Sequence, residues 1–269
     1  MTRAPSLVGV VHLPPLPGSP RASKGCEEIA AGAVRDARLL QSAGFDVVVV
    51  ENFGDAPFFA ERVPAVTVSA MTACAVAIRQ ACPDFPLGIN VLRNDAEAAL
   101  AIAAVTDARC IRVNVHTGAR VTDQGLVQGR AAETLRARRA LGAGRVAIWA
   151  DVDVKHSTPL GEGDPAREAE DLAKRGLVDV VLVTGDGTGR SVDEGKLRRV
   201  REAVAGVPVL VASGATEETL ASLAPLCDGV IVGSALRVDG VAGGAVDPER
   251  AARFAAAFAR AFANRPRHA

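Results

Sequence analysis

The sequence predicts an α/β fold of the (β/α)₈ type, the TIM barrel, in which eight parallel strands close into one sheet inside a ring of helices. Three observations lead to this fold class. The chain has 269 residues, a length at which one-domain α/β barrels are common. Short runs rich in valine and isoleucine alternate with helical stretches. The apolar runs are nearly continuous, as in strands buried on both faces. We therefore expect a single barrel domain over residues 1–269.

Eight apolar runs are predicted to be the strands of the barrel. They are rich in β-branched residues and are bounded by glycine, proline or polar residues. In chain order they cover residues 7–13, 46–52, 86–92, 110–115, 146–154, 178–184, 207–213 and 229–233. Eight units favour a closed barrel, and an open doubly wound sheet is the alternative architecture.

Helical stretches lie between these runs and are often preceded by Asp, Ser or Thr and followed by Gly. They cover residues 27–42, 96–105, 129–141, 165–175, 192–204 and 217–224. Residues 248–264 are expected to form the closing helix. Their pattern of Ala, Phe and Arg is also compatible with a helix on a membrane surface, but packing against the barrel is favoured.

The composition favours a small-molecule ligand over nucleic acid or membrane. Thirty-one basic and 31 acidic residues give a net charge of zero. Tyrosine is absent and aromatic residues make up 3%, so a base-stacking platform is not expected. The apolar run near the N-terminus is short and is interrupted by prolines, which argues against a signal peptide or an integral membrane segment. Peripheral membrane contact is not expected either.

The five cysteines are scattered and odd in number, which favours reduced thiols in a cytoplasmic protein. We expect them to be small core residues. Dimers are common among such barrels, so a homo-oligomer, most simply a dimer, is expected.

Polar residues stand where the predicted strands end, which is where TIM barrels bind their ligands. His12, Glu51 and Asn90 lie at the ends of the first three strands. In strand four Arg112, Asn114 and His116 alternate along the chain and are expected to point into the barrel.

The fifth strand continues this polar group. Its residues Asp151, Asp153 and Lys155 share one face with Trp149. An ion-pair network that only fills the barrel, with Arg112 on Asp151 or Asp153, is the structural alternative for the lower layer. Apolar residues would fill the upper layer at a lower desolvation cost, so polar residues there indicate function.

The candidate catalytic residues form one set: Asp153, Lys155, His116, Asn114, Glu51 and Asp151. Lys155 can act as a cation that stabilises a developing anion or, if desolvated, as a base or an amine nucleophile. Glu51 and His156 are alternative groups for proton transfer. The residues alone leave these roles open.

The last three strands end in loops that suit a phosphate group. Glycines there allow backbone N–H groups to approach phosphate oxygens, serine hydroxyls can donate, and a helix directly after strand eight would add its positive end. The candidate substrate- and phosphate-binding residues are Gly185, Asp186, Ser213, Gly214, Gly233, Ser234, Asn90, Arg112 and His12. The alternative is ordinary turn chemistry.

Residues 116–130 are polar, contain glycine and are long enough for a lid over the ligand. A solvated connection is the alternative. Mg²⁺ is a possible cofactor, because Asp151, Asp153, Asp186 and Glu51 offer oxygen ligands. The sequence has no HExxH motif or Cys/His cluster for zinc and no GxGxxG after the first strand for a dinucleotide.

Four motifs resemble the BtpA/SgcQ family over nearly the whole chain. They are VHLPPLPG at 11–18, ENFGDAPF at 51–58, GINVLRN at 88–94 and ADVDVKH at 150–156. The resemblance implies a fold similar to the ribulose-phosphate-binding barrels. It also implies two different roles. The founding cyanobacterial member is associated with photosystem I stability, whereas SgcQ relatives accompany sugar-utilisation genes.

Three functions are therefore compared. The favoured one is an enzyme that acts on a phosphorylated sugar or nucleoside-like metabolite by acid/base chemistry; lyase, isomerase, transferase and hydrolase reactions all remain open. The second is a non-catalytic assembly or stability factor of the photosystem I biogenesis type. The third is a sensor that binds a phosphorylated metabolite without converting it.

Overall fold

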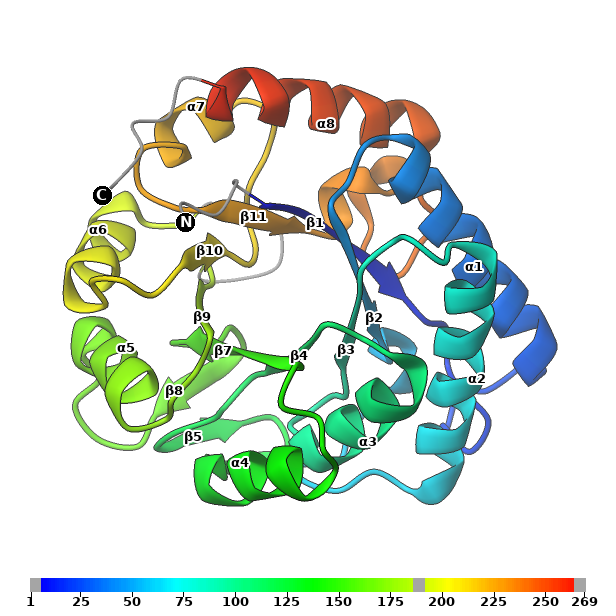
Figure 1. The fold of residues 1–269 in the computed structure, drawn as a ribbon, viewed down its shortest axis with the longest axis horizontal. Coiled ribbons are helices and arrows are strands. Elements are labelled where there is room, and N and C mark those ends of the chain that lie inside the picture. Colours follow the sequence, from blue (N-terminus) through cyan, green and yellow to red (C-terminus); the bar gives the residue numbers. More distant parts are fainter. Residues whose placement is uncertain (1–5, 186–191, 264–269) are drawn as a thin grey trace.

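Eight parallel strands close into a barrel, as the sequence predicts (Figure 1). The computed structural model describes residues 6–185 and 192–263. Around the barrel the strand order is β1-β11-β10-β9-β7-β4-β3-β2. The strands are β1 Ser6–His12, β2 Val47–Glu51, β3 Leu87–Asn90, β4 Cys110–Val113, β7 Ala147–Val152, β9 Val180–Val183, β10 Val209–Val211 and β11 Gly229–Val232. Each lies within a predicted apolar run or differs from it by one residue.

Helices surround the barrel (Figure 1). They are α1 Cys26–Ser42, α2 Ala65–Ala81, α3 Ala96–Thr106, α4 Ala131–Ala140, α5 Pro165–Lys174, α6 Glu194–Ala203, α7 Leu220–Leu223 and α8 Pro248–Phe262. Aspartates begin several of them: the side chains of Asp95, Asp164, Asp193 and Asp247 each accept a backbone N–H in the first helical turn. None of the helices in the described part of the chain is long and apolar enough to cross a membrane.

Two apolar layers hold the fold together. The larger lies between the strands and the surrounding helices and includes Ile29, Met71 and Phe254. The smaller fills the inside of the barrel with Val8, Val10, Val49, Cys110, Trp149, Val180, Leu182, Leu210, Ala212 and Ile231. Cys74, Cys82, Cys110 and Cys227 are buried and Cys26 is half-buried. The filled interior means that a ligand meets the barrel at its open end.

A small antiparallel sheet is attached beside β4 and β7. The hairpin β5 Ala119–Thr122 and β6 Gly125–Gln128 pairs with β8 Ser157–Pro159. Strand β5 thus joins the segment after β4 to the segment after β7. The stretch 116–130, predicted as a lid, is therefore largely a hairpin whose strand β5 pairs with β8.

Candidate functional site

A row of polar side chains crosses the inner face of the barrel where β1 to β4 end. His12 of β1 pairs in register with Glu51 of β2. Asn90 of β3 pairs with Glu51 on one side and with Arg112 of β4 on the other. Because residues in register in a parallel sheet project to the same face, the four side chains gather. Asn90 Nδ2 donates to Glu51 Oε2 at 2.5 Å, so the Glu51 carboxylate is held in place.

Arg112 forms a buried ion pair with Asp151. Its Nε and Nη2 atoms donate to the two Asp151 carboxylate oxygens at 3.0 and 2.9 Å, and Asn114 Nδ2 donates to Asp151 Oδ2 at 2.8 Å. Asp151 is 1% exposed. Burial opposes the charge on Arg112, but the attraction of Asp151 outweighs it and raises the pKa of the guanidinium. Arg112, Asn114 and Asp151 thus point into the barrel, as expected. The pair between Arg112 and Asp151 is the ion pair that the sequence analysis gave as the structural alternative for the lower layer.

His12 is held as a neutral imidazole. Its Nδ1 atom accepts the Gly243 N–H at 3.2 Å, and its ring stacks on Phe53 with 4.5 Å between centroids. Burial and the nearby cations Arg237, Lys155 and Arg112 lower its pKa well below 6.5. The proton of the neutral ring is then on Nε2, which lies 3.9 Å from Glu51 Oε1 and can donate to a ligand oxygen.

A cavity that is open to solvent adjoins this row. Part of its wall consists of His12, Glu51, Arg112 and Lys155. Another part consists of the loops after β10 and β11, at residues 213–216 and 233–235. Charged groups and the two glycine-serine loops of the sequence prediction therefore share one cavity.

The loops after the last strands have features that suit an anion. Gly214 has a φ of 80°, which favours glycine, and the Gly185 N–H donates to Ser213 Oγ at 3.0 Å. The Ser213 hydroxyl hydrogen is then free to donate to a ligand. A Cβ atom on Gly233 would lie 2.9 Å from His12 Cε1, so this loop packs directly on the imidazole.

The helix expected directly after strand eight is not present there. Residues Ser234–Leu236 form one 3₁₀ turn, η2, and α8 begins at Pro248. So short a turn has little dipole to offer an anion. The intervening segment 237–247 instead crosses toward the cavity and contributes Gly240 and Ala242 to its wall.

Lys155 follows β7 and lines the cavity. Burial and repulsion by Arg112 lower the pKa of its ammonium group, although Glu51 and Asp151 act in the opposite direction. Among the described residues, Lys155 Nζ forms no hydrogen bond or ion pair. Lys24, Lys174 and Lys196 each form at least one such contact.

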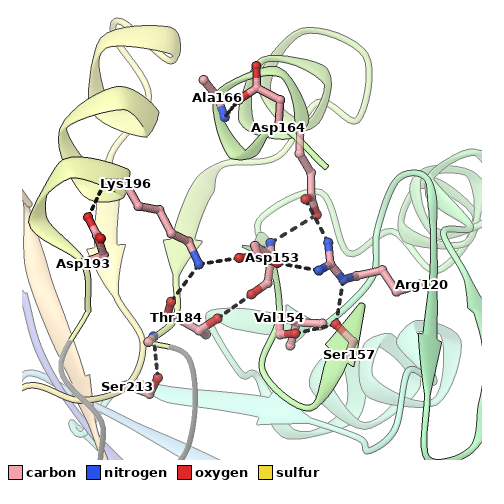
Figure 2. A network of polar contacts seen from close by, with 12 residues as sticks. Arg120, Asp153, Val154, Ser157, Asp164, Ala166, Thr184, Asp193, Lys196 and Ser213 are labelled. Carbon is pink, nitrogen blue, oxygen red and sulfur yellow. Dashed lines mark hydrogen bonds and ion pairs between the residues drawn. The ribbon is translucent and has the colours of Figure 1, made fainter. Parts of the chain in front are cut away.

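Asp153 does not share the cavity face with Lys155. The strand ends at Val152, and the left-handed φ of 49° at Asp153 breaks the alternation on which the inward orientation was predicted. The carboxylate pairs with Arg120 of β5 and, at 2.6 Å, with Lys196 Nζ of α6 (Figure 2). It therefore links the hairpin to α6 at the edge of the barrel mouth.

The network around Asp153 extends to α5. Glu168 accepts the Asp153 N–H at 3.2 Å and pairs with Arg120 Nη1 at 3.1 Å. Despite burial, the contacts with Lys196 and Arg120 lower the pKa of Asp153, whereas burial raises the pKa of Glu168. The sequence reasoning did not single out Arg120, Glu168 or Lys196. Their signal was weak, because each is a charged residue in a polar segment.

His116 also points away from the cavity, contrary to the predicted orientation. Its Nε2 atom donates to the Gly176 carbonyl at 2.9 Å, and the residue is 1% exposed. Strand β4 ends at Val113, so the alternation no longer holds three residues later. Burial lowers the pKa of His116. The geometry indicates a packing role for this imidazole.

Acidification is expected to destabilise the protein through His116. Its folded pKa lies below the ordinary 6.5, so the unfolded chain binds the proton first. The stabilisation is complete above about pH 6.5 and is lost below it, by at most about 1.4 kcal/mol per pH unit. Urea denaturation at about pH 7.5 and about pH 5.5 measures this loss. His116→Gln should lose less than the wild type over this interval, and the loss that remains reflects the lowered pKa values of His12 and His156. Equal losses in wild type and His116→Gln would contradict the assignment.

Asp186 lies outside the described residues, so its predicted part in ligand or Mg²⁺ binding stays a prediction. Among residues 6–185 and 192–263, no group of three or more His, Cys, Asp or Glu side chains is arranged to hold a metal ion.

Comparison with known proteins gives the family. The model described as the BtpA family matches residues 3–260. The chain is 43% identical to the photosystem I biogenesis protein BtpA of Synechocystis sp., over 97% of this chain and 90% of that protein. It is 30% identical to the putative sgc region protein SgcQ of Escherichia coli, over 93% and 92% of the two chains.

Solved structures show the same fold at low sequence identity. The 3-keto-L-gulonate-6-phosphate decarboxylase of Vibrio cholerae has a TM-score of 0.57 at 14% identity, with 97% of this chain and 98% of that one covered. Phosphoribosyl anthranilate isomerase of Thermus thermophilus has a TM-score of 0.57 at 14% identity, with 94% and 98% covered. These likenesses show a TIM-barrel fold. By its family match and its close relatives, this chain belongs to the BtpA family.

Proposed function

We propose that this protein is an enzyme that acts on a phosphorylated sugar or nucleoside-like metabolite by acid/base chemistry in the cavity at the barrel mouth. One observation carries the proposal: a single cavity is lined both by the glycine-serine loops after β10 and β11 and by Lys155, Glu51 and His12. Backbone N–H groups and serine hydroxyls at such loops bind a phosphate, and the charged wall faces the rest of the ligand.

The groups on the charged wall divide the chemical roles. Glu51 is a carboxylate fixed by Asn90 and is the candidate base. His12, neutral with its proton on Nε2, is the candidate donor to a developing oxyanion. The ion pair with Asp151 fixes the Arg112 guanidinium in the same cavity wall as Lys155. Asp153, Asn114 and His116 are displaced from the cavity lining and are proposed as supporting residues.

Ligand-dependent stabilisation tests the phosphate part of the proposal. Ribulose 5-phosphate, ribose 5-phosphate and inorganic phosphate are expected to raise the thermal unfolding midpoint, because a ligand that binds only the folded state stabilises it. Ribulose and ribose without phosphate serve as controls. The same midpoint with and without every phosphorylated compound would overturn the proposal.

Ser234→Ala is expected to weaken the binding of inorganic phosphate by about 10- to 100-fold, because a hydrogen bond to a charged group contributes about 1.5–3 kcal/mol. Isothermal titration calorimetry measures the change. Ser222→Ala is the matched control, since Ser222 is exposed on α7 and its hydroxyl contacts Thr219. Phosphate affinity that is unchanged in Ser234→Ala would remove this serine from the proposed site.

The name of the Synechocystis relative favours a second candidate, a non-catalytic assembly factor. That function predicts that Lys155→Ala leaves the cellular phenotype intact while changes on the protein surface abolish it. A metabolite sensor would bind a phosphorylated compound but return it unchanged. Mass spectrometry after long incubation distinguishes the sensor from the enzyme.

A further inference from the structure

Lys155 differs from the other lysines of the chain in its contacts. The sequence contains four lysines. Lys24, Lys174 and Lys196 each pair with a carboxylate, at 2.7, 2.5 and 2.6 Å. Lys155 lines the cavity, and no contact between its Nζ atom and a carboxylate is formed among the described residues. Its amine is therefore available to a molecule in the cavity.

The surroundings of Lys155 make its amine easier to deprotonate than that of a free lysine. The cations Arg112 and Arg93 repel a charge on it, and burial removes its hydration, so its pKa is lowered. Glu51 and Asp151 attract the charge, but both are already engaged. Both carboxylate oxygens of Asp151 accept hydrogen bonds from Arg112, and Glu51 accepts a hydrogen bond from Asn90. Protonated Lys155 thus gains less from these carboxylates than it would from a direct ion pair.

A neutral amine in this cavity can act as a base or as a nucleophile. Glu51 and His12 line the same cavity and can already accept and donate a proton. A further base adds little there, whereas an amine nucleophile adds covalent chemistry that neither group offers. The nearby phosphate-type loops would hold the ligand for this attack.

We propose that Lys155 forms an iminium with a ketone or aldehyde carbon of the ligand, so that the substrate class is a phosphorylated carbonyl compound. The inference rests on the proposed function, because it uses the same cavity and the same phosphate anchor. It goes further in naming the reacting carbon and the covalent residue.

The step balances with groups in the cavity and solvent. The Nζ lone pair adds to the carbonyl carbon, and one amine proton is transferred to the carbonyl oxygen to give a carbinolamine. The hydroxyl group then leaves as water, with one proton delivered from solvent through Glu51, and the nitrogen lone pair forms the C=N bond. The product is a protonated iminium, and no oxidant or reductant is consumed.

Reductive trapping tests the proposal. The protein is incubated with dihydroxyacetone phosphate, glyceraldehyde 3-phosphate or ribulose 5-phosphate, reduced with sodium borohydride and analysed by peptide mass spectrometry. The expected product is a peptide containing Lys155 whose mass has increased by that of the probe less one oxygen atom. Excess inorganic phosphate is expected to suppress this label.

Two variants and one parallel measurement make the outcome decisive. Lys155→Arg places a cationic side chain with no nucleophilic amine at this position and should lose the label, whereas Lys174→Arg, at an exposed position on α5, should retain it on Lys155. Calorimetric binding of glycerol 3-phosphate, which has no carbonyl group, is measured alongside. The iminium would be overturned if glycerol 3-phosphate binds but the carbonyl probes leave no label on Lys155. It would also be overturned if the carbonyl probes label the four lysines evenly. Failure of all phosphorylated compounds to bind would instead overturn the proposed function.

Discussion

Arg112→Met is expected to lower the free energy of unfolding by about 3–5 kcal/mol, because it leaves a buried carboxylate without its charge partner. Asp151 is 1% exposed and receives two hydrogen bonds from Arg112. After the substitution Asn114 is the donor to Asp151 that remains among residues 6–185 and 192–263. Urea denaturation followed by circular dichroism measures the change.

Two controls separate this effect from a general loss of charge. Arg145→Met breaks an exposed pair with Asp107, in which both side chains are about half exposed, and should change stability by about 0–1 kcal/mol. Combining Arg112→Met with Asp151→Leu removes both buried charges and should restore much of the lost stability. If Arg112→Met costs no more than Arg145→Met, the buried pair is not a stabilising unit.

Arg237→Met is expected to cost a similar amount, about 3–5 kcal/mol, for a different structural reason. Arg237 is fully buried, and its guanidinium joins three parts of the fold. Nη1 donates to Asp36 of α1 at 2.7 Å and to the Gly244 carbonyl at 3.0 Å, while Nη2 donates to the Val10 carbonyl of β1. The substitution removes these three hydrogen bonds and frees one end of the segment that lines the cavity, while Asp36 still accepts the Val246 N–H at 3.4 Å.

Hydrogen exchange distinguishes this local role from a uniform loss of stability. In Arg237→Met the amides of residues 238–246 should exchange faster than the decrease in global stability explains. Arg253→Met, which breaks an exposed pair with Glu217, is the control and should leave their exchange unchanged. Unaltered protection of residues 238–246 in Arg237→Met would show that the segment is held by other contacts.

The barrel could be predicted from the sequence because its strands are chemically distinct. Runs such as residues 47–50 of β2 and Val180–Val183 are buried on both sides, so they are apolar without interruption. The hairpin β5–β6 and strand β8 were not predicted. Their four- and three-residue strands are polar and half exposed, and they are held by contacts distant in sequence, such as Arg120 to Asp153. Helix α2 was also not singled out.

The inward orientation of the polar side chains could be predicted as far as the strands continue. Within β4 and β7 the alternation of side chains places Arg112 and Asp151 in the interior, where they pair. Past the strand ends the chain turns, and neither His116 nor Asp153 follows the pattern. Lys155, two residues after the left-handed turn at Asp153, lines the cavity. Such backbone turns are fixed by tertiary contacts, which cannot be inferred from the alternation of side chains along a strand.

The single tryptophan gives this barrel an intrinsic optical reporter. Trp149 is 5% exposed in the barrel interior, in register with Arg112 on β4 and two residues before Asp151 on β7. The chain has no tyrosine, so nearly all of its near-ultraviolet emission comes from this indole. Its fluorescence is therefore sensitive both to water entering the barrel and to charge rearrangement beside Arg112. A ligand that reaches the polar row can be followed by this signal without any added dye.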